Sequence, residues 1–137
     1  MHLLRNGAYN VFVATGYKQK NDARGLMGEL RARGHDIMTD WTEASGLSRE
    51  QMALRDVRGM FGADVLVALM TLPDYEYKGT FTEFGMAVGR QIPIVLISPF
   101  AEPDTTGAVC AKNVYWALPT MERSTSVPAW LEALDKK

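Results

Sequence analysis

Cysteine and histidine, the residues that build disulfide frameworks and most zinc sites, are nearly missing from this sequence. Among its 137 residues there is one cysteine, Cys110, and there are two histidines, His2 and His35. A single cysteine excludes an internal disulfide and a metal site built from a cysteine cluster. The two histidines are far apart in sequence and show no metal-ligand spacing. We therefore expect no metal site.

Long hydrophobic runs and an excess of charge of one sign are also absent. No stretch approaches the roughly 18 apolar residues of a membrane-spanning helix, and no long apolar run follows Arg5, so we expect no signal peptide. The chain has 15 basic and 16 acidic residues, for a net charge of −1. This balance creates no field that attracts nucleic acid polymers or anionic membranes. We expect a soluble cytoplasmic protein with neither of these as a partner.

What the sequence does contain is an alternation of short apolar segments with longer amphipathic ones. Its hydrophobic content of 47% and charged content of 23% are ordinary for a globular domain, and the length suits one domain over residues 1–137. Strands that alternate with helices predict a parallel sheet covered on both faces. The fold class expected is therefore α/β, with a single-domain, open, parallel, five-stranded sheet of the flavodoxin-like or Rossmann-like type.

The boundaries of these elements follow from periodicity and from start and stop signals. Strands are expected at residues 11–14, 35–39, 64–70, 93–97 and, more weakly, 113–116. Helices are expected from Asn21 or Asp22 to Arg33, from a Ser48 capping box to about Gly62, from Thr80 to about Arg90, and over residues 128–134. Gly34 is expected to end the first helix.

Polar and aromatic residues gather where the predicted strands end. Residues 15–18 follow the first strand, Asp40 and Trp41 the second, residues 74–80 the third, and Ser98 the fourth. In open parallel sheets, ligands bind beyond the carboxyl ends of the strands. We therefore expect the functional site at this edge of the sheet.

Glu83 is the first candidate for chemistry. With Thr80 as the N-cap, Glu83 falls at the third helical position, and Thr-x-x-Glu is a capping box. The helix dipole there favours an ionised carboxylate, which is the form that a nucleophile requires. Phe81 and Phe84 offer an apolar wall for a base or a sugar face, and Gly79 leaves room for close approach. From the residues alone, a structural cap and a catalytic carboxylate both stay open.

Asp56 is the second candidate, because it falls on the apolar arc of its helix. At about 100° per residue it lies between Met52 and Met60, on the arc that also holds Ala53 and Val57. A carboxylate on a core-facing stripe is costly unless it is paired or hydrogen-bonded. A functional role and a hydrogen bond to a nearby loop both explain it.

The loop before Glu83 carries charged and aromatic side chains. Asp74, Tyr77 and Lys78 lie in it, and Lys18 follows the first strand. Loops at strand ends often carry function, but side chains of these types are also common in solvated loops. Both interpretations stay open for this segment.

Taken together, these residues resemble the nucleoside 2-deoxyribosyltransferase family, which includes related 2′-deoxynucleoside 5′-monophosphate N-glycosidases. The similar pattern runs from about residue 11 to about residue 97. It comprises residues 14–17, residues 30–36, residues 55–57 with 63–67, and Gly79-Thr80-x-x-Glu83-x-Gly85-x-Ala87. The last element is the most specific of the four.

The resemblance implies that Glu83 is a nucleophile that attacks the anomeric carbon of a 2-deoxyribosyl group and forms a covalent intermediate. It implies that Asp56 helps to position the sugar hydroxyls or the nucleophile, and that Tyr17 is the aromatic residue after the first strand. Such chemistry matches retaining glycoside cleavage and needs no metal or organic cofactor. The candidates for contact with substrate are Gly16, Lys18, Asp74, Tyr77, Lys78, Gly79, Thr80 and Ser98.

The implied function is cleavage or exchange of the N-glycosidic bond of 2′-deoxynucleosides, with a small-molecule nucleoside or nucleotide as ligand and a homodimer or larger homo-oligomer as the assembly. One departure leaves the substrate open: the transferases carry an acidic residue six positions before the glutamate, where this chain has Tyr77. Hydrolysis of nucleoside 5′-monophosphates to base and sugar phosphate, with Lys18 and Lys78 on the phosphate, is an alternative. A non-enzymatic nucleotide-binding or signalling module, with Glu83 as a cap, is an alternative of another class.

Overall fold

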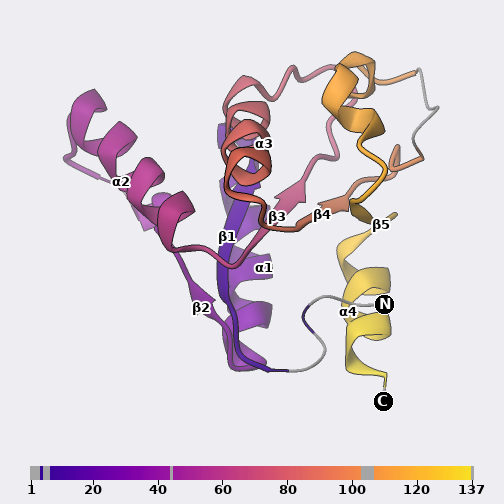
Figure 1. Ribbon diagram of the computed structural model, residues 1–137, viewed down its shortest axis with the longest axis horizontal. Coiled ribbons are helices and arrows are strands. Elements are labelled where there is room, and N and C mark those ends of the chain that lie inside the picture. The colour runs from indigo at the N-terminus through magenta and orange to yellow at the C-terminus, as the bar shows by residue number, and fades with distance from the viewer. Residues whose placement is uncertain (1–3, 5–6, 44, 103–106, 137) are drawn as a thin grey trace.

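Five parallel strands form one sheet in the order β2-β1-β3-β4-β5 (Figure 1). The computed structural model describes residue 4 and residues 7–43, 45–102 and 107–136. The strands are β1 (Asn10–Thr15), β2 (Asp36–Ile37), β3 (Val65–Leu69), β4 (Ile94–Ile97) and β5 (Glu122–Ser124). The α-helices are α1 (Lys20–Ala32), α2 (Arg49–Gly62), α3 (Lys78–Arg90) and α4 (Val127–Asp135). The predicted open parallel α/β sheet is confirmed.

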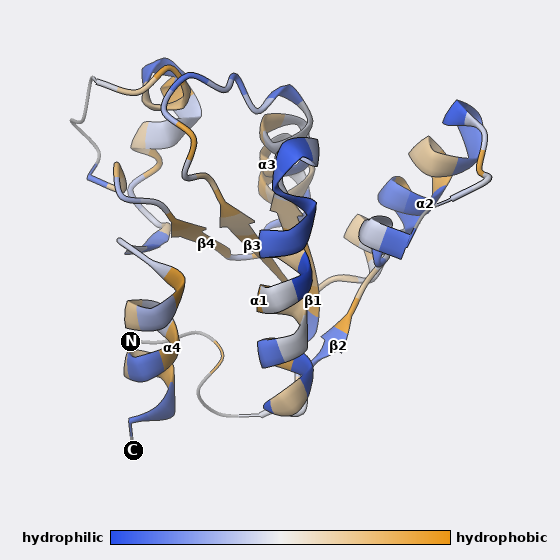
Figure 2. Cartoon of the chain, turned by 180° about the vertical axis from the view of Figure 1, so that it is seen from behind, coloured by the Kyte–Doolittle hydropathy of each residue, from blue (hydrophilic) through white to orange (hydrophobic). Residues whose placement is uncertain are grey.

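The three central strands are apolar on both sides because helices cover both faces of the sheet (Figure 2). Alternate side chains of a strand point to opposite faces, so β1 contributes to two separate cores. Val11 and Val13 pack on the side of α1 and α4, with Leu26 and Trp130. The other face carries Phe12, Ala14, Phe84 and Trp116, with α3 and the 3-10 segments η3 (Cys110–Lys112) and η4 (Val114–Ala117).

The predicted fifth strand at residues 113–116 is wrong. Residues Val114–Ala117 form η4, because the side chain of Asn113 accepts a hydrogen bond from the Tyr115 amide at 2.9 Å. Trp116 is buried in the core, and its Nε1 donates to the Phe100 carbonyl at 3.1 Å. The true edge strand is β5, whose Glu-Arg-Ser sequence has no apolar alternation to reveal it.

Other predicted boundaries hold where the signal is local. The Ser48 capping box is present, with Ser48 and Gln51 bonded reciprocally at 3.1 and 2.8 Å. Gly34, with φ of +89°, follows the end of α1 as predicted. The predicted caps Asn21 and Asp22 are wrong, because α1 begins at Lys20 after the 3-10 turn η1 (Tyr17–Gln19).

Two glycines in α1 give a prediction about stability. Gly25 and Gly28 are exposed, and beyond the neighbouring backbone of α1 an added methyl group at either position would meet no atom within 4 Å. Alanine restricts the unfolded chain and favours the helix, so Gly25→Ala and Gly28→Ala should each raise the free energy of unfolding by about 0.5–1 kcal/mol. Urea denaturation measures this, and a loss of stability in either variant would show that α1 packs differently.

Among the described residues, no helix is long and apolar enough to cross a membrane. Within the same residues, no three His, Cys, Asp or Glu side chains are grouped so that they could hold a metal ion.

Candidate active site

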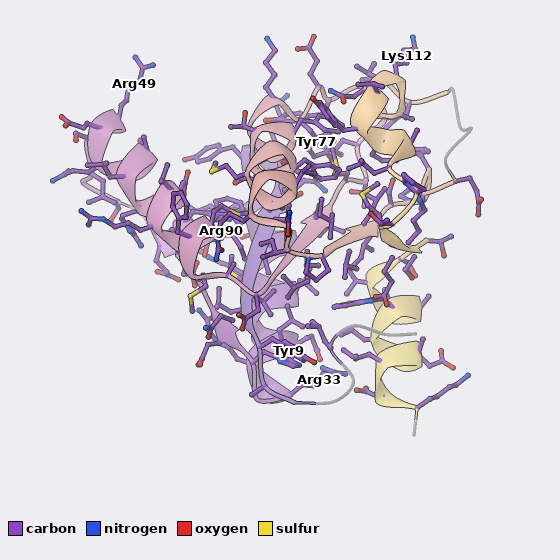
Figure 3. The ribbon with its side chains drawn as sticks, in the orientation of Figure 1. Tyr9, Arg33, Arg49, Tyr77, Arg90 and Lys112 are labelled. Atoms are coloured by element: carbon purple, nitrogen blue, oxygen red, sulfur yellow. The ribbon has the colours of Figure 1, made fainter. Side chains whose placement is uncertain are left out.

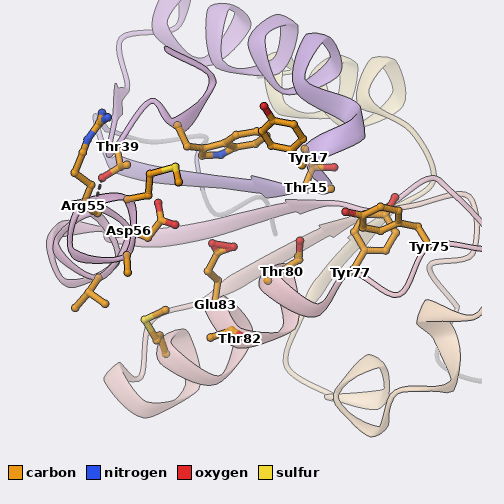
Figure 4. Close-up of a pocket in the computed structure, with 17 residues that line it drawn as sticks. Thr15, Tyr17, Thr39, Arg55, Asp56, Tyr75, Tyr77, Thr80, Thr82 and Glu83 are labelled. Atoms are coloured by element: carbon orange, nitrogen blue, oxygen red, sulfur yellow. Dashed lines mark hydrogen bonds between the residues drawn. The ribbon is translucent and has the colours of Figure 1, made fainter. Parts of the chain in front are cut away.

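A cleft of about 670 Å³ lies at the carboxyl end of β1, between α2 and α3 (Figure 4). The chain passes from β1 outward to β2 on one side and then to β3 on the other. The cleft therefore lies at the switch point of strand order, where open α/β sheets bind their ligands. The cleft lies at the edge of the sheet where the sequence predicts the functional site.

Seven of the predicted site residues come together at this cleft. They come from the loop after β1, from α2 and from the start of α3, three segments that are far apart in the sequence. The seven are Gly16, Tyr17, Asp56, Tyr77, Gly79, Thr80 and Glu83.

Four other predicted residues lie outside the described lining of the cleft, which corrects the expectation that they gather there. Ser98 is fully buried, and its Oγ accepts a hydrogen bond from the Phe100 amide at 3.1 Å. Lys78 lines a separate shallow hollow beside η3, where its Nζ is 3.2 Å from Glu76. Lys18 extends over the ring of Tyr75, with its Nζ 5.9 Å from the ring centre. Asp74 is exposed on the loop.

The predicted Thr80 capping box is also wrong. α3 begins at Lys78, and the residue at its N-cap is Tyr77, in the left-handed conformation with φ of 55°. Glu83 is therefore the sixth residue of the helix and lies in its second turn. Its carboxylate is too far along the helix to cap the first amides, because capping residues sit at the N-cap and the third helical position. Glu83 lines the cleft instead.

Burial, not the helix dipole, controls the ionisation of Glu83. Packing around the carboxyl group and, to a smaller extent, the charge of Asp56 raise the pKa of Glu83 from 4.5 to about 8. The side chain is only partly buried, because it opens into the cleft. Burial also raises the pKa of Asp56, although the nearby Arg55 opposes this shift. The expectation that the helix end favours the ionised form of Glu83 is therefore wrong.

Asp56 faces Glu83 from the opposite wall of the cleft (Figure 4). Asp56 lies on the apolar arc of α2. This arc was predicted to face the core, and that prediction is wrong. α2 projects away from the sheet, with Arg49 at its free end (Figures 1 and 3). Of its residues, all of which the structure describes, only Gly59 and Met60 are buried. Met52, Ala53 and Val57 line the cleft, so the arc forms one of its walls.

Two residues that line the cleft, Arg55 and Trp41, were not among the predicted catalytic residues or substrate contacts. Arg55 is the only basic side chain among the described residues that line the cleft, and Thr39 Oγ1 donates to its carbonyl at 2.8 Å. The Trp41 indole is fixed as a wall, because its Nε1 donates to the Val13 carbonyl at 2.8 Å. The position of Trp41 after a strand was a usable signal. Arg55 gave none, because an arginine on an amphipathic helix is normally solvated.

Thr80 is the buried polar group of the cleft that has no protein partner. Its side chain is 2% exposed, and its Oγ1 makes no hydrogen bond among the described residues. Buried hydroxyl groups are nearly always hydrogen-bonded, so an unpaired one in a residue that lines the cleft is a candidate for a ligand contact. It lies in the first turn of α3, where no described side chain caps the helix amides.

Known proteins share this fold but differ widely in sequence. No protein-family profile matches the chain, and no curated protein matches it significantly. A crystal structure of a conserved protein from Enterococcus faecalis V583 is 18% identical with a TM-score of 0.65, over 94% of this chain and 96% of that one. The CMP N-glycosidase BcmB of Clostridium botulinum is 20% identical with a TM-score of 0.56, over 91% of this chain and 93% of that one. These similarities establish the fold.

Proposed function

We propose that this protein is an N-glycosidase that cleaves the bond between base and sugar in nucleoside 5′-monophosphates, with Glu83 as the nucleophile. The observation that carries the proposal is the pair of carboxyl groups, Glu83 and Asp56, that face each other across a cleft at the switch point of the sheet. The shared fold with a CMP N-glycosidase supports it, as does the family resemblance of residues 79–87.

The reaction proceeds in two displacements. An oxygen of ionised Glu83 attacks the anomeric carbon, while the carbon–nitrogen bond breaks and its electron pair leaves with the base, which takes up a proton. Water then attacks the same carbon, the bond to Glu83 breaks, and the carboxylate is restored as the water loses a proton. Asp56 is the second carboxyl group of the cleft, and we assign it the exchange of these protons. Two displacements on opposite faces retain the configuration of the sugar.

The first turn of α3 is suited to the 5′-phosphate. Helix N-termini attract anions through their free amides and the helix dipole, and Gly79 leaves that turn open, since nothing lies within 4 Å of where a methyl group would be. The unpartnered Thr80 hydroxyl adds a donor. Glu83 lies about one turn further along the helix, or about 5.4 Å, a separation of the order of that between phosphate and anomeric carbon in one nucleotide.

A substrate panel tests the proposal. The protein is incubated with ribo- and deoxyribonucleosides and their 5′-monophosphates, with and without a second free base, and the products are separated by chromatography. We expect free base and sugar phosphate from a monophosphate, with much slower turnover of the matching nucleoside. Turnover only with an added base would indicate a transferase. No turnover of any compound would overturn the proposal and favour a non-enzymatic nucleotide-binding module.

The pH dependence of the reaction follows from the pKa of Glu83. Only the ionised form attacks, so kcat/KM should rise about tenfold per pH unit and level off above about pH 8. The substrate phosphate titrates near pH 6. A rising limb of the kcat/KM profile that ends near pH 8 therefore reports a group of the protein and not the phosphate. Burial is the main cause of the raised pKa of Glu83 and the charge of Asp56 a smaller one, so Asp56→Asn should move this limb only part of the way to lower pH. A limb that stays in place in this variant would contradict the assigned coupling.

A further inference from the structure

Tyr77 stands where the transferases of the resembling family carry an acidic residue, six positions before the glutamate. Its hydroxyl group is not free to bind a ligand. The residue is 1% exposed. The hydroxyl donates to Gln19 Oε1 and accepts a hydrogen bond from the Leu72 amide at 2.9 Å. Figure 3 shows the side chain inside the molecule at the start of α3. Both hydrogen-bonding capacities of the phenol are therefore used by the protein.

Gln19 is the centre of the network that Tyr77 joins. It is 4% exposed and follows β1 directly, in η1. Its Oε1 also lies 3.0 Å from Thr15 Oγ1, at the end of β1. Its Nε2 donates to Thr71 Oγ1 at 2.6 Å, just after β3. One buried amide thus connects the ends of two central strands to the start of the helix that carries Glu83.

The backbone of Tyr77 needs such support. A residue with a Cβ atom rarely adopts the left-handed conformation, and Tyr77 has φ of 55°. Its ring makes an edge contact with Tyr75, with centroids 4.7 Å apart. Tyr75 in turn packs on Gly16, where an added methyl group would lie only 3.0 Å from the Tyr75 ring. The turn at Tyr77, where α3 begins beside the cleft, is therefore packed through Tyr75 against the loop after β1.

We propose that Tyr77 is a positioning residue: its hydroxyl group, through Gln19, fixes the start of α3 relative to the Gly16–Tyr17 wall and so sets where Glu83 meets the sugar. The inference rests on the proposed function. A displacement of about 1 Å costs a reaction about 100-fold. The apolar arc of α2 (Met52, Ala53 and Val57) and the Trp41 indole are not part of this link, and the first turn of α3 moves together with Glu83 because both belong to one helix. Loss of the hydroxyl should therefore lower kcat and leave KM nearly unchanged.

The test compares Tyr77→Phe with Trp130→Phe. The control removes a hydrogen bond and part of the ring of a buried aromatic residue on the opposite face of the sheet, where Trp130 Nε1 donates to Glu122 at 2.7 Å, so it disturbs the core at least as much as Tyr77→Phe does. Tyr77→Phe should lower kcat about 10- to 100-fold with KM within about threefold, and Trp130→Phe should keep kcat. Gln19→Ala cuts the same link and also removes the contacts with Thr15 and Thr71, so it should lower kcat at least as much as Tyr77→Phe, and the double variant should be no worse than Gln19→Ala alone. Unchanged kcat in Tyr77→Phe, or an equal loss in the control, would overturn the proposal.

Amide hydrogen exchange gives a readout that does not need activity. In Tyr77→Phe, exchange should become faster in both residues 15–19 and residues 77–84, and it should stay unchanged in α4. Faster exchange in only one of the two segments, or in neither, would overturn the coupling. If the wild-type protein cleaves no nucleotide, the proposed function fails, and this measurement still decides whether Tyr77 joins the two walls.

Discussion

Replacement of Glu83 by glutamine is expected to abolish the reaction and to stabilise the protein at alkaline pH. An amide cannot form the sugar ester, so kcat should fall by about 10³-fold or more, as for other nucleophile replacements. The stability gain has a separate cause, namely the burial that raises the pKa of Glu83 from 4.5 to about 8. A role as a helix cap would give the opposite change in stability.

The sign of this effect follows from proton linkage. Below pH 4.5 the carboxyl group is protonated in both the folded and the unfolded chain. Between 4.5 and about 8 it ionises only in the unfolded chain, so the wild-type protein loses stability as pH rises, by at most about 4–5 kcal/mol. Glutamine does not titrate. The melting temperatures of Glu83→Gln and wild type should therefore be close at pH 4.5 and should diverge toward pH 8, with the variant higher.

Glu132→Gln, a change of an exposed residue on α4, is the control for this experiment and should leave activity and the melting temperature at pH 8 close to those of wild type. If Glu83→Gln instead kept its activity, Glu83 would not be the nucleophile. If the variant melted below wild type at pH 8, that result would contradict a raised pKa for the Glu83 carboxyl group.

The second large effect is expected at Gly59, where α2 touches the body of the protein. A methyl group at Gly59 would lie 2.2 Å from Thr39 Oγ1, 2.8 Å from Thr39 Cβ and 3.0 Å from Phe12. Gly59→Ala must therefore shift α2, at a cost of about 1–3 kcal/mol. Asp56 lies one turn earlier on the same helix, so the shift also moves it relative to Glu83. Activity should fall about 100-fold.

Gly62→Ala, on the same helix, is the matched control. Its methyl group would make only an ordinary contact with Met38 at 3.4 Å, so both stability and kcat should stay close to wild type. Denaturant unfolding and steady-state kinetics of the two variants measure the difference. Wild-type stability and activity in Gly59→Ala would show that α2 is not held where the structure places it.

The sequence predicted the elements whose signals are local or are repeated on both faces of the sheet. β1, β3 and β4 are continuous apolar runs because they are buried on both sides. The Ser48 capping box needs only residues three apart. The edge strand β5 was missed because its short polar sequence pairs on one side and carries no alternation.

The candidate site was predicted in part. The errors in that prediction arise from tertiary contacts, which no local pattern reveals. The start of α3 depends on Tyr77 and Gln19, which are 58 residues apart, so no local pattern distinguished it from a Thr80 cap. Periodicity placed Asp56 on an apolar arc but gave no information on whether that arc meets a core or a cleft. Ser98 follows a strand as expected, yet it is fully buried and bonded within its own turn.

Trapping of the covalent intermediate tests the central claim most directly. A nucleoside 5′-monophosphate with fluorine at the 2′ position suits this purpose, because the electron-withdrawing group destabilises the cation-like transition state and the adduct accumulates. After acid quenching and digestion, mass spectrometry should find one sugar phosphate on the peptide that contains Glu83, and none in Glu83→Gln. An adduct on another residue, or base release with no adduct on Glu83, would contradict the account.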